Sequence, residues 1–307
     1  MILITGGTGR LGKYVSPMLL KSGKKIRLMT QFEERGASVV NANLFDEDSL
    51  LRACEGVDTV IHLAATLDYT LPAKEMIRIN YGGTKNMLDA ASKSGVSKFV
   101  FASSVSVYGR SNELPIDEEN KLNAKEPYGV SKKKAEEAVK KSGIGYTILR
   151  PTVIYGKGFD AGFETIAKLT KSGKMKIIGN GKNRIHFTHA KDCAKAFYLA
   201  ATKKPFNEAF NIAGPDTVTQ NEALKMVARF YGVEPPTKHV NKHIALIMSE
   251  ISYAAAKARK TKPKVLPEYV KVISSDRYFD ITKAKKLLGY KPTIGYKTGL
   301  KDALNAF

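Results

Sequence analysis

The sequence is poor in cysteine, with only Cys54 and Cys193, and it has no tryptophan. Two cysteines cannot build a disulfide framework or, by themselves, a zinc cage, so both classes of small stapled protein are excluded. No apolar run approaches the ~20 residues that a membrane-spanning helix needs, which excludes an integral membrane protein. The first residues follow a strand pattern without a basic leader, so we expect a cytoplasmic protein in a reducing compartment.

Acidic residues are scarce as well: 29 Asp and Glu stand against 50 Lys and Arg, which leaves a net charge of +21. This excess favours anionic partners such as phosphorylated ligands, nucleic acid or an anionic membrane surface. The lysines are spread along the whole chain, and no motif of a nucleic-acid-binding module accompanies them. We interpret the charge as a solubilising surface, and we expect a small-molecule substrate and no nucleic-acid partner.

The first half of the chain alternates short apolar runs with helical patterns. This alternation predicts βαβ units and an α/β fold of the Rossmann type, a doubly wound parallel sheet. Ligands of such a sheet bind at the carboxyl ends of its strands. The predicted strands cover residues 2–5, 26–30, 57–63, 98–103 and 147–150, and the predicted helices cover 11–21, 48–54, 75–94 and 127–142.

Beyond residue 151 the alternation fades, and Gly and Pro interrupt the pattern. Helical patterns remain over residues 162–171, 191–202, 221–231 and 242–257. We see neither a repeat nor a low-complexity linker. The sequence therefore predicts a smaller C-terminal lobe, residues 152–307, packed on the first domain and returning some segments to it.

A glycine-rich turn follows the first predicted strand and opens the first predicted helix: Thr5-Gly6-Gly7-Thr8-Gly9-Arg10-Leu11-Gly12. Glycines there permit a tight turn, a close approach of the backbone to a pyrophosphate, and close packing of the helix on the strand. The helix N-terminus offers free N–H groups to the phosphates. The motif predicts that residues 1–151 form an NAD(P)-binding domain and that the second lobe mainly binds substrate.

The end of the second predicted strand leaves the choice of dinucleotide open. An NAD site normally has an acidic residue there, which accepts a hydrogen bond from the ribose 2′-hydroxyl. Here Thr30 takes that position, and Glu33 comes a few residues late. Arg10, Lys13 and Arg35 could neutralise a 2′-phosphate. We therefore expect NAD or NADP, with a preference for NADP.

Tyr128 and Lys132 stand four residues apart at the start of a predicted helix, so their side chains share one face. A phenol with an ordinary pKa of about 10 is a poor base at neutral pH. A nearby ammonium and a positively charged nicotinamide ring both favour the phenolate and lower that pKa. Tyr128 could then take a proton from a hydroxyl while hydride leaves the same carbon, and Lys132 could also hold a ribose hydroxyl. Hydroxyls at Ser103 and Ser104 could bind the reacting oxygen.

Together these motifs resemble those of the extended short-chain dehydrogenase/reductases, the group of NAD-dependent epimerases, dehydratases and 3β-hydroxysteroid-type dehydrogenases. The resemblance covers nearly the whole chain. Beside the glycine-rich turn and the Tyr-Lys pair, it is carried by His62-Leu63-Ala64-Ala65, Asn80-Tyr81-Gly82-Gly83-Thr84, Ser103-Ser104-(x3)-Tyr108-Gly109, Arg150-Pro151 and Asp280-(x2)-Lys283-Ala284-(x2)-Leu287-Leu288-Gly289-Tyr290-(x)-Pro292.

The resemblance implies roles for individual residues. Tyr128 would be the acid/base, Lys132 its activator and ribose clamp, and Ser104 the partner of the substrate oxygen. Asn43 stands where the family often has an aspartate that binds the adenine amino group, and its carbonyl can still accept. A homodimer is also implied. The residues implied to contact the dinucleotide are Gly6, Gly9, Arg10, Leu11, Gly12, Thr30, Asn43, Leu44, Leu63, Ala64, Ala65, Asn80, Ser103, Tyr128, Lys132, Pro151 and Val153.

Two departures from the family pattern narrow the reaction. The 4,6-dehydratases of the family have an Asp-Glu pair where this chain has Val105 and Ser106, so the carboxyl pair that eliminates water is missing. Nucleotide-sugar epimerases usually carry an arginine shortly before a His-Val-x-Asp element. Anchored on Asp192, Arg184 comes one residue early and would face the wrong side of a strand. The nucleotide-sugar interpretation is therefore weakened but stays open.

Residues 242–264 support a different substrate. An apolar helix, which includes Ile244, Ile247 and Ile251, is followed by a basic flank. Such a helix could cover a lipophilic substrate or lie on an anionic membrane surface, and its placement is similar to that in the 3β-hydroxysteroid and dihydroflavonol-reductase branch. A core-covering helix with a solvated tail is the alternative. The flank contains Lys257, Arg259, Lys260, Lys262 and Lys264.

We therefore expect an NAD(P)-dependent nucleotide-sugar epimerase or a related ketoreductase, acting on a secondary alcohol by tyrosine-assisted hydride transfer. A dehydrogenase of lipophilic substrates is the first alternative. A non-catalytic dinucleotide sensor is the second, although intact Tyr128 and Lys132 argue against it. We interpret His186 and His189 as strand packing, and we predict no metal site.

Overall fold

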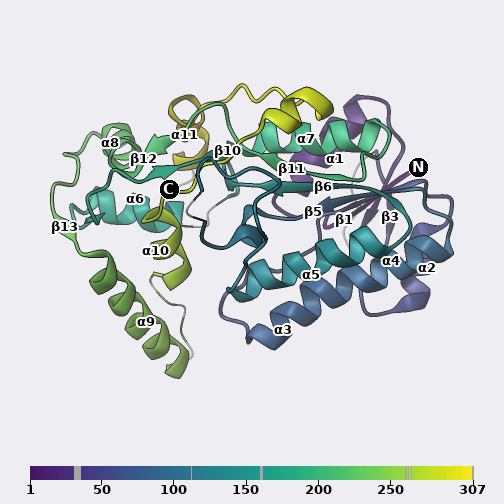
Figure 1. The fold of residues 1–307 in the computed structure, drawn as a ribbon, viewed down its shortest axis with the longest axis horizontal. Coiled ribbons are helices and arrows are strands. Elements are labelled where there is room, and N and C mark those ends of the chain that lie inside the picture. Colours follow the sequence, from purple (N-terminus) through teal and green to yellow (C-terminus); the bar gives the residue numbers. More distant parts are fainter. Residues whose placement is uncertain are drawn as a thin grey trace.

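The structure, a computed structural model, describes residues 1–30, 36–111, 113–159, 162–259, 261, 263 and 265–305. Seven parallel strands form its central sheet in the order β3-β2-β1-β4-β5-β6-β11 (Figure 1). This order confirms the expected doubly wound sheet. The strands are β1 (Ile2–Thr5), β2 (Ile26–Met29), β3 (Ser38–Val40), β4 (Thr59–His62), β5 (Lys98–Ala102), β6 (Gly145–Pro151) and β11 (Glu208–Ile212).

Helices cover both faces of the sheet, so its inner strands are buried on both sides, while the edge strand β3 stays exposed. Along β1, Leu3 joins one core, while Ile2 and Ile4 join the other. Helices α1 (Gly12–Lys21) and α7 (Ala190–Thr202) pack on each other over the Ile4 side. The Leu3 side is covered by α2 (Glu47–Cys54), α4 (Gly83–Lys93) and α5 (Pro127–Lys141).

The helix predicted over residues 75–94 is a continuous helical segment with a π turn at its centre. It consists of α3 (Ala73–Ile77), the π-helix η1 (Arg78–Gly82) and α4. The wider turn buries the side chain of Asn80, which is only 1% exposed. This places a side-chain amide beneath the carboxyl ends of the strands, where the site lies.

The second half of the chain builds a smaller lobe around a third core, in which Tyr155, Phe187 and Tyr296 pack together. Three short strand pairs frame it: β7 (Val153–Tyr155) with β10 (Phe187–His189), β9 (Arg184–Ile185) with β12 (Val218–Thr219), and β8 (Ile177–Ile178) with β13 (His239–Val240). Its helices are α6 (Phe163–Lys171), α8 (Gln220–Phe230), α9 (Lys242–Ala258), α10 (Pro267–Ile273) and α11 (Tyr296–Leu304).

Two segments of the second half lie in the sheet layers: β11 pairs with β6, and α7 packs on α1. The π-helix η3 (Ala284–Leu288) packs in turn on α7 and β11. In Figure 1, α9 projects away from the body on the side opposite the sheet edge formed by β3. A division into residues 1–151 and 152–307 remains our interpretation of this arrangement.

Candidate active site

The site lies at the carboxyl ends of β1, β4 and β5. Strand β1 pairs with β2 on one side and with β4 on the other, so the chain order reverses at β1. In open α/β sheets, ligands bind in the crevice at such a switch point. The glycine-rich turn, the residues after β4 and the hydroxyls after β5 all meet there.

The glycine-rich turn packs too tightly for side chains. Gly6 has a φ of +67°, and a Cβ atom there would lie 2.9 Å from the Ala64 backbone nitrogen. A Cβ on Gly12 would lie 2.3 Å from the Gly7 oxygen. The first turn of α1 therefore sits directly against the turn, and Gly9 and Arg10 are exposed beside it. This cradle fits a pyrophosphate approached by backbone alone.

A buried chain of hydrogen bonds joins β1, β4 and the π turn. The Ala64 N–H donates to Thr5 Oγ1 at 3.2 Å, and Thr5 Oγ1 lies 2.8 Å from His62 Nδ1. His62 Nε2 lies 3.1 Å from Thr84 Oγ1, which donates its only proton to the Asn80 carbonyl at 2.6 Å. Since Thr84 must accept from His62, Nε2 of the imidazole carries a proton. Burial lowers the pKa of His62 to about 3.

Asn80 extends this chain to α5. Its side-chain oxygen accepts from the Thr66 N–H at 2.8 Å, and its amide nitrogen donates to Ser131 Oγ at 3.1 Å. Ser131 donates to the Tyr128 carbonyl at 2.7 Å. Asn80 was predicted to contact the dinucleotide. Its amide holds the loop after β4 against the first turn of α5, and its contact with the dinucleotide stays a prediction.

The three residues predicted to be catalytic come together. Ser104 ends the β5 segment and caps the short 3₁₀ helix η2 (Val105–Tyr108), accepting from the Ser106 N–H at 3.1 Å. Tyr128 is the second residue of α5, is buried, and is hydrogen-bonded to Ser104. Lys132 lies one turn later, with Nζ 2.8 Å from the Ala102 carbonyl and 5.9 Å from the centre of the Tyr128 ring.

Burial shifts both ionisable groups toward their neutral forms. It raises the pKa of Tyr128 above its ordinary value, and the hydrogen bond to Ser104 only partly opposes this. It lowers the pKa of Lys132 to about 7. In the chain by itself, burial dominates the pKa of Tyr128. The expected lowering of this pKa by the ammonium together with a nicotinamide ring stays a prediction.

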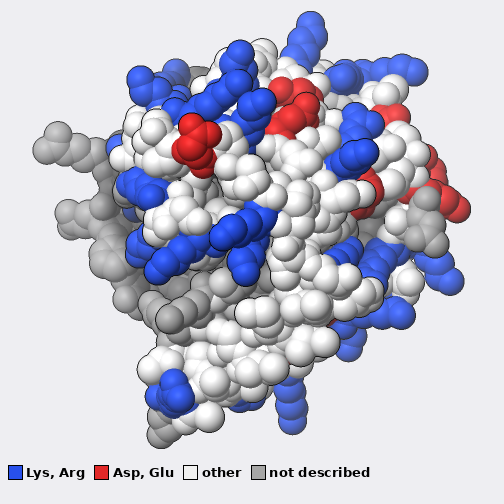
Figure 2. Space-filling view, turned by 90° about the vertical axis from the view of Figure 1, so that its left-hand side faces the viewer, with Lys and Arg blue, Asp and Glu red and all other residues white. Residues whose placement is uncertain are grey.

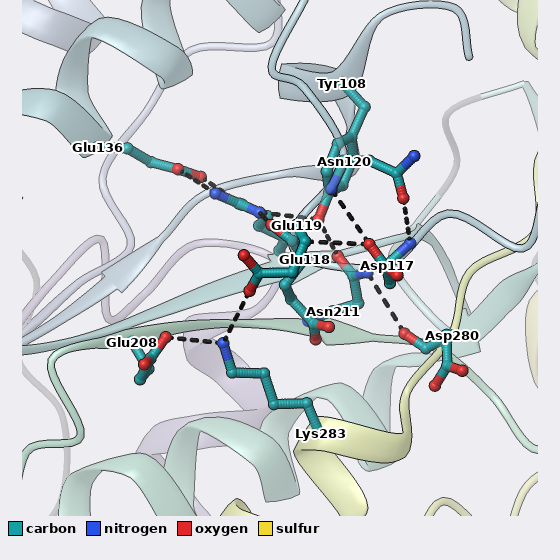
Figure 3. A network of polar contacts seen from close by, with 11 residues as sticks. Tyr108, Asp117, Glu118, Glu119, Asn120, Glu136, Glu208, Asn211, Asp280 and Lys283 are labelled. Carbon is teal, nitrogen blue, oxygen red and sulfur yellow. Dashed lines mark hydrogen bonds and ion pairs between the residues drawn. The ribbon is translucent and has the colours of Figure 1, made fainter. Parts of the chain in front are cut away.

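Ser103 was predicted to line the cofactor path, and that role stays a prediction. Its hydroxyl donates to Glu136, which forms a two-pronged ion pair with Arg150 at 2.9 and 2.7 Å. Both partners are at most 2% exposed. Arg150 also donates to the Tyr108 hydroxyl at 2.8 Å. Figure 3 shows Glu136 at one end of this network, which secures the strand end that carries Ser104.

The same network reaches the C-terminal part of the chain. Tyr108 donates to the Asn211 side chain at 2.7 Å, and the Asn211 amide donates to the carbonyls of Ile116 and Asp280 (Figure 3). Lys283 pairs with Glu208 at 2.7 Å. The closing signature that includes Asp280 and Lys283 thus ties the last strand of the sheet to the segment after the hydroxyl cluster.

The other residues predicted to contact the dinucleotide lie at or after the carboxyl ends of β1, β2, β3, β4 and β6. Thr30 Oγ1 lies 3.3 Å from Thr8 Oγ1, at the edge of the glycine-rich turn. The exposed Asn43 uses its side-chain oxygen to accept from the Phe45 N–H at 2.9 Å. Leu44 packs where a Gly83 side chain would stand. Leu11, Leu63 and Ala64 are half-buried, Ala65 is exposed, Pro151 ends β6, and Val153 packs on the third core.

Sequence reasoning missed the aromatic wall of the site. Tyr69 lies edge-on to Tyr128, with ring centres 6.3 Å apart, and edge-on to Tyr269 of α10, at 6.4 Å. The Tyr253 hydroxyl of α9 donates to the Tyr69 carbonyl at 3.0 Å. These tyrosines come from three separate segments of the chain. They meet only through the packing of the second lobe, so no local sequence pattern indicates them.

Arg277 was missed too. Its Nη2 donates to the Val105 carbonyl at 3.3 Å, directly beside Ser104. Its Nε is buried, and among the described residues it has no hydrogen-bond partner. Burial lowers the pKa of this guanidinium, although Glu268 and Tyr69 oppose the shift. A buried donor left open beside the reacting groups suits an anionic substituent of a substrate.

Arg184 does not point into the site. Its guanidinium donates to Thr217 Oγ1 at 2.7 Å and stacks 4.4 Å from the Tyr278 ring centre. His186 lies 3.0 Å from the Gly214 carbonyl, and His189 is buried against Tyr155. Of the residues predicted to choose between NAD and NADP, Arg10 and Lys13 are exposed near the turn. Glu33 and Arg35 lie outside the described residues.

Comparisons with known proteins agree with this geometry. Residues 2–213 match the model of the NAD dependent epimerase/dehydratase family. The chain belongs to this family. A protein of Methanocaldococcus jannaschii named "Putative UDP-glucose 4-epimerase" is 31% identical over 99% of the chain and 97% of its own length. Family membership makes the chain an NAD-dependent enzyme of the extended short-chain dehydrogenase/reductase type, as expected.

Other family members differ in what they act on. The sterol-4-alpha-carboxylate 3-dehydrogenase of Mus musculus is 25% identical over 99% of the chain and 90% of its own length. The structure of MoeE5 in complex with UDP-glucose and NAD has a TM-score of 0.77 and 25% identity, and covers 99% of the chain and 97% of that protein. Within the part of the chain that the structure describes, we find neither a cluster of metal-ligating side chains nor a helix long and apolar enough to cross a membrane.

Proposed function

We propose that this family member interconverts a secondary alcohol and a ketone, with Tyr128 as the acid/base. The observation that carries the proposal is the meeting of Tyr128, Ser104 and Lys132 in a buried site beside the glycine-rich turn. Ser104 would bind the reacting oxygen. Tyr128 would exchange a proton with that oxygen.

The direction of the proton transfer follows from the burial of Tyr128. Because its pKa is raised, the phenol is protonated at neutral pH and can donate to a ketone oxygen as that oxygen gains charge. In the oxidation direction it must first lose its proton, and protonated Lys132 favours that step. When bound, the dinucleotide supplies or accepts the hydride. The residues that would hold it are Gly6, Gly9 and Gly12 at the pyrophosphate and Lys132 at a ribose hydroxyl.

We propose NAD as the cofactor. The family description and the NAD-bound relative support this choice, and no comparison supports the NADP preference drawn from Thr30 and the nearby cations. Titration of the purified chain with NAD and with NADP tests it. A dissociation constant for NADP at least tenfold lower than that for NAD would overturn the choice.

As substrate we propose a nucleotide sugar, which would make the enzyme an epimerase. Two relatives carry names with UDP-glucose, and the open Nε of Arg277 offers a donor for a phosphate beside the site. Arg277 would take the place that sequence reasoning considered for Arg184. In an epimerase, the ketone would rotate in the pocket and then be reduced from its other face.

The test is to denature freshly purified protein, identify the released small molecules by mass spectrometry, and assay UDP-glucose for conversion to its 4-epimer. We expect near-stoichiometric NAD(H) and conversion. Tyr128→Phe should lower turnover by about 10²–10⁴-fold while NAD binding survives. Turnover unaffected by Tyr128→Phe would overturn the acid/base assignment. Net NADH production without epimer would overturn the epimerase assignment alone.

A dehydrogenase of lipophilic alcohols is the second candidate. It is favoured by α9, whose apolar side chains are exposed at Ile244, Ile247, Met248 and Ile251, next to the aromatic wall. Three results would support this dehydrogenase over the epimerase: the protein is purified without bound dinucleotide, it reduces a lipophilic ketone when reduced cofactor is added, and it leaves UDP-glucose unchanged.

We also keep a homodimer and a cytoplasmic location as proposals. The family resemblance supports the dimer, in which α4 and α5 of the nucleotide-binding half would be the contact helices. Light scattering on the eluting protein measures the mass directly, and a monomer at micromolar concentration would overturn the dimer.

A further inference from the structure

The outward face of α9 consists of apolar side chains. Residues spaced three and four apart share a helix face, and Ile244, Ile247, Met248 and Ile251 form such a series. They are 53%, 59%, 62% and 65% exposed. Ala255 and Ala258 continue the same stripe and are exposed as well. We call these six residues the α9 stripe.

The opposite face of α9 attaches the helix to the body. Ser249 and Ala256 are buried, Leu246 and Tyr253 are half-buried, and the helix packs on α10. Tyr253 donates to the Tyr69 carbonyl. The helix is therefore held in a fixed orientation, with its stripe pointing away from the protein. None of the described residues covers the stripe.

The charged residues around the α9 stripe indicate which kind of partner covers it. Around the stripe, Lys238, Lys257 and Arg259 are exposed, and Glu250 is the single acidic residue between residues 238 and 259. Figure 2 views the side from which α9 projects: Lys and Arg dominate the charged side chains there, and the lower part is largely uncharged. The whole chain carries +21. An apolar stripe flanked by cations matches an anionic lipid surface.

We propose that α9 docks this enzyme on an anionic membrane surface, with the α9 stripe inserted among the acyl chains and Lys257 and Arg259 at the headgroups. A second copy of the chain is a poor occupant, because it would bring two strongly basic surfaces together. The inner face of α9 touches Tyr69, which lies against Tyr128. Docking therefore brings Tyr69, and with it the Tyr128 side of the site, toward the bilayer, whichever substrate the enzyme takes.

The chain has no tryptophan, so one introduced tryptophan reports on its own position. Ile247→Trp should show a blue shift of its emission, and quenching by brominated lipid, when vesicles of equal parts phosphatidylglycerol and phosphatidylcholine are added. Leu287→Trp is the matched control, because Leu287 is 51% exposed on η3. It should show neither change. Equal responses from both positions would overturn insertion of α9.

Vesicle sedimentation measures the strength of binding. Ile247→Glu should weaken binding by at least about tenfold, as expected when an aliphatic side chain that enters the bilayer is replaced by a charge. Leu287→Glu adds the same charge elsewhere and should leave binding within about twofold. Lys257→Glu and Arg259→Glu should each weaken it about fivefold or more.

Three results would overturn the proposal. Equal losses for Ile247→Glu and Leu287→Glu would show adsorption by overall charge. Binding to vesicles of pure phosphatidylcholine that is as strong as binding to the anionic vesicles would show that the anionic headgroups contribute nothing. A blue shift of Ile247→Trp that grows with protein concentration without vesicles would show that the stripe pairs two copies. All variants change exposed side chains, and unchanged NAD binding and melting temperatures verify their folding.

Discussion

The fold buries the ammonium group of Lys132 in the N-terminal half of α5, and this burial has a measurable cost in stability. Its pKa falls from the ordinary Lys range to about 7, so between about pH 7 and 10 the unfolded chain binds a proton that the folded chain releases. Stability therefore rises with pH across this window, by up to about 1.4 kcal/mol per pH unit from this residue. Below pH 7 both states are protonated and the dependence ends.

Lys132→Met removes that dependence. We expect the variant to gain stability relative to the parent at pH 7 and to lose this advantage as the pH approaches 10, in urea unfolding at several pH values. Lys140→Met, at an exposed position of the same helix, should run parallel to the parent. A constant difference between Lys132→Met and the parent from pH 7 to 10 would contradict the lowered pKa.

The ion pair of Glu136 and Arg150 is buried beneath the site. Arg150→Met would leave the Glu136 carboxylate buried with Ser103 as its remaining donor, at a cost of about 3–5 kcal/mol. The double variant Glu136→Gln/Arg150→Met removes both charges and should recover part of that loss. Urea unfolding of the two variants measures it. A double variant less stable than Arg150→Met would show that the charge is not the cause.

At the scale of single residues, the sequence predicted the contacts that depend on short spacing along the chain. Tyr128 and Lys132 are one helical turn apart, and Ser104 follows a strand that must end at the same edge, so their meeting could be predicted. The hydrogen bond from Ser103 to Glu136 could not be predicted, because nothing local shows that this hydroxyl turns toward α5. Arg277 and Tyr69 stayed hidden because they reach the site only through the packing of the second lobe.

Among the elements, the join of β1 and α1 leaves no room for an added side chain. A Cβ on Gly12 would lie 2.3 Å from the Gly7 carbonyl oxygen, so Gly12→Ala must push α1 off the turn. We expect a loss of about 1–3 kcal/mol in stability and a larger loss of NAD affinity. Thermal unfolding and a NAD titration measure these.

Gly82→Ala is the matched control for that change. A Cβ there meets only the Phe45 ring, at 3.7 Å, and the backbone is already helical. It should be neutral or gain up to about 1 kcal/mol, as alanine does over glycine in helices. If both variants bound NAD like the parent, the turn would not be the pyrophosphate cradle.

Long elements could be predicted from the sequence within one or two residues, because periodicity over ten or more residues is a strong signal. The helix predicted over 191–202 is α7, at Ala190–Thr202, and the one over 242–257 is α9. Strands of two residues such as β8 and β13 gave no signal, since their pairing partners are far away in the sequence. The π turn between α3 and α4 was also invisible, because the apolar pattern runs through it.

At the scale of the whole molecule, an experiment can test whether the first lobe folds without the second. The fragment 1–151 ends with β6, whose outer edge pairs with β11, and it lacks α7, whose Phe197 fills the core over β1 and β5. We expect the fragment to be unable to unfold cooperatively or to bind NAD, because a sheet face and an edge would be open. Circular dichroism and NAD titration test this. Cooperative unfolding of the fragment would make residues 1–151 an autonomous domain.

Asn211 has a further consequence, for synthesis on the ribosome. One of its hydrogen bonds joins the last strand of the sheet to Asp280, a carbonyl that is translated 69 residues later. A growing chain exposes the edge of β6 until β11 has emerged, and the Asp280 carbonyl that holds Asn211 follows later still. Such half-made sheets are prone to aggregate. Until that edge is covered, we expect nascent chains of this enzyme to be clients for holding chaperones.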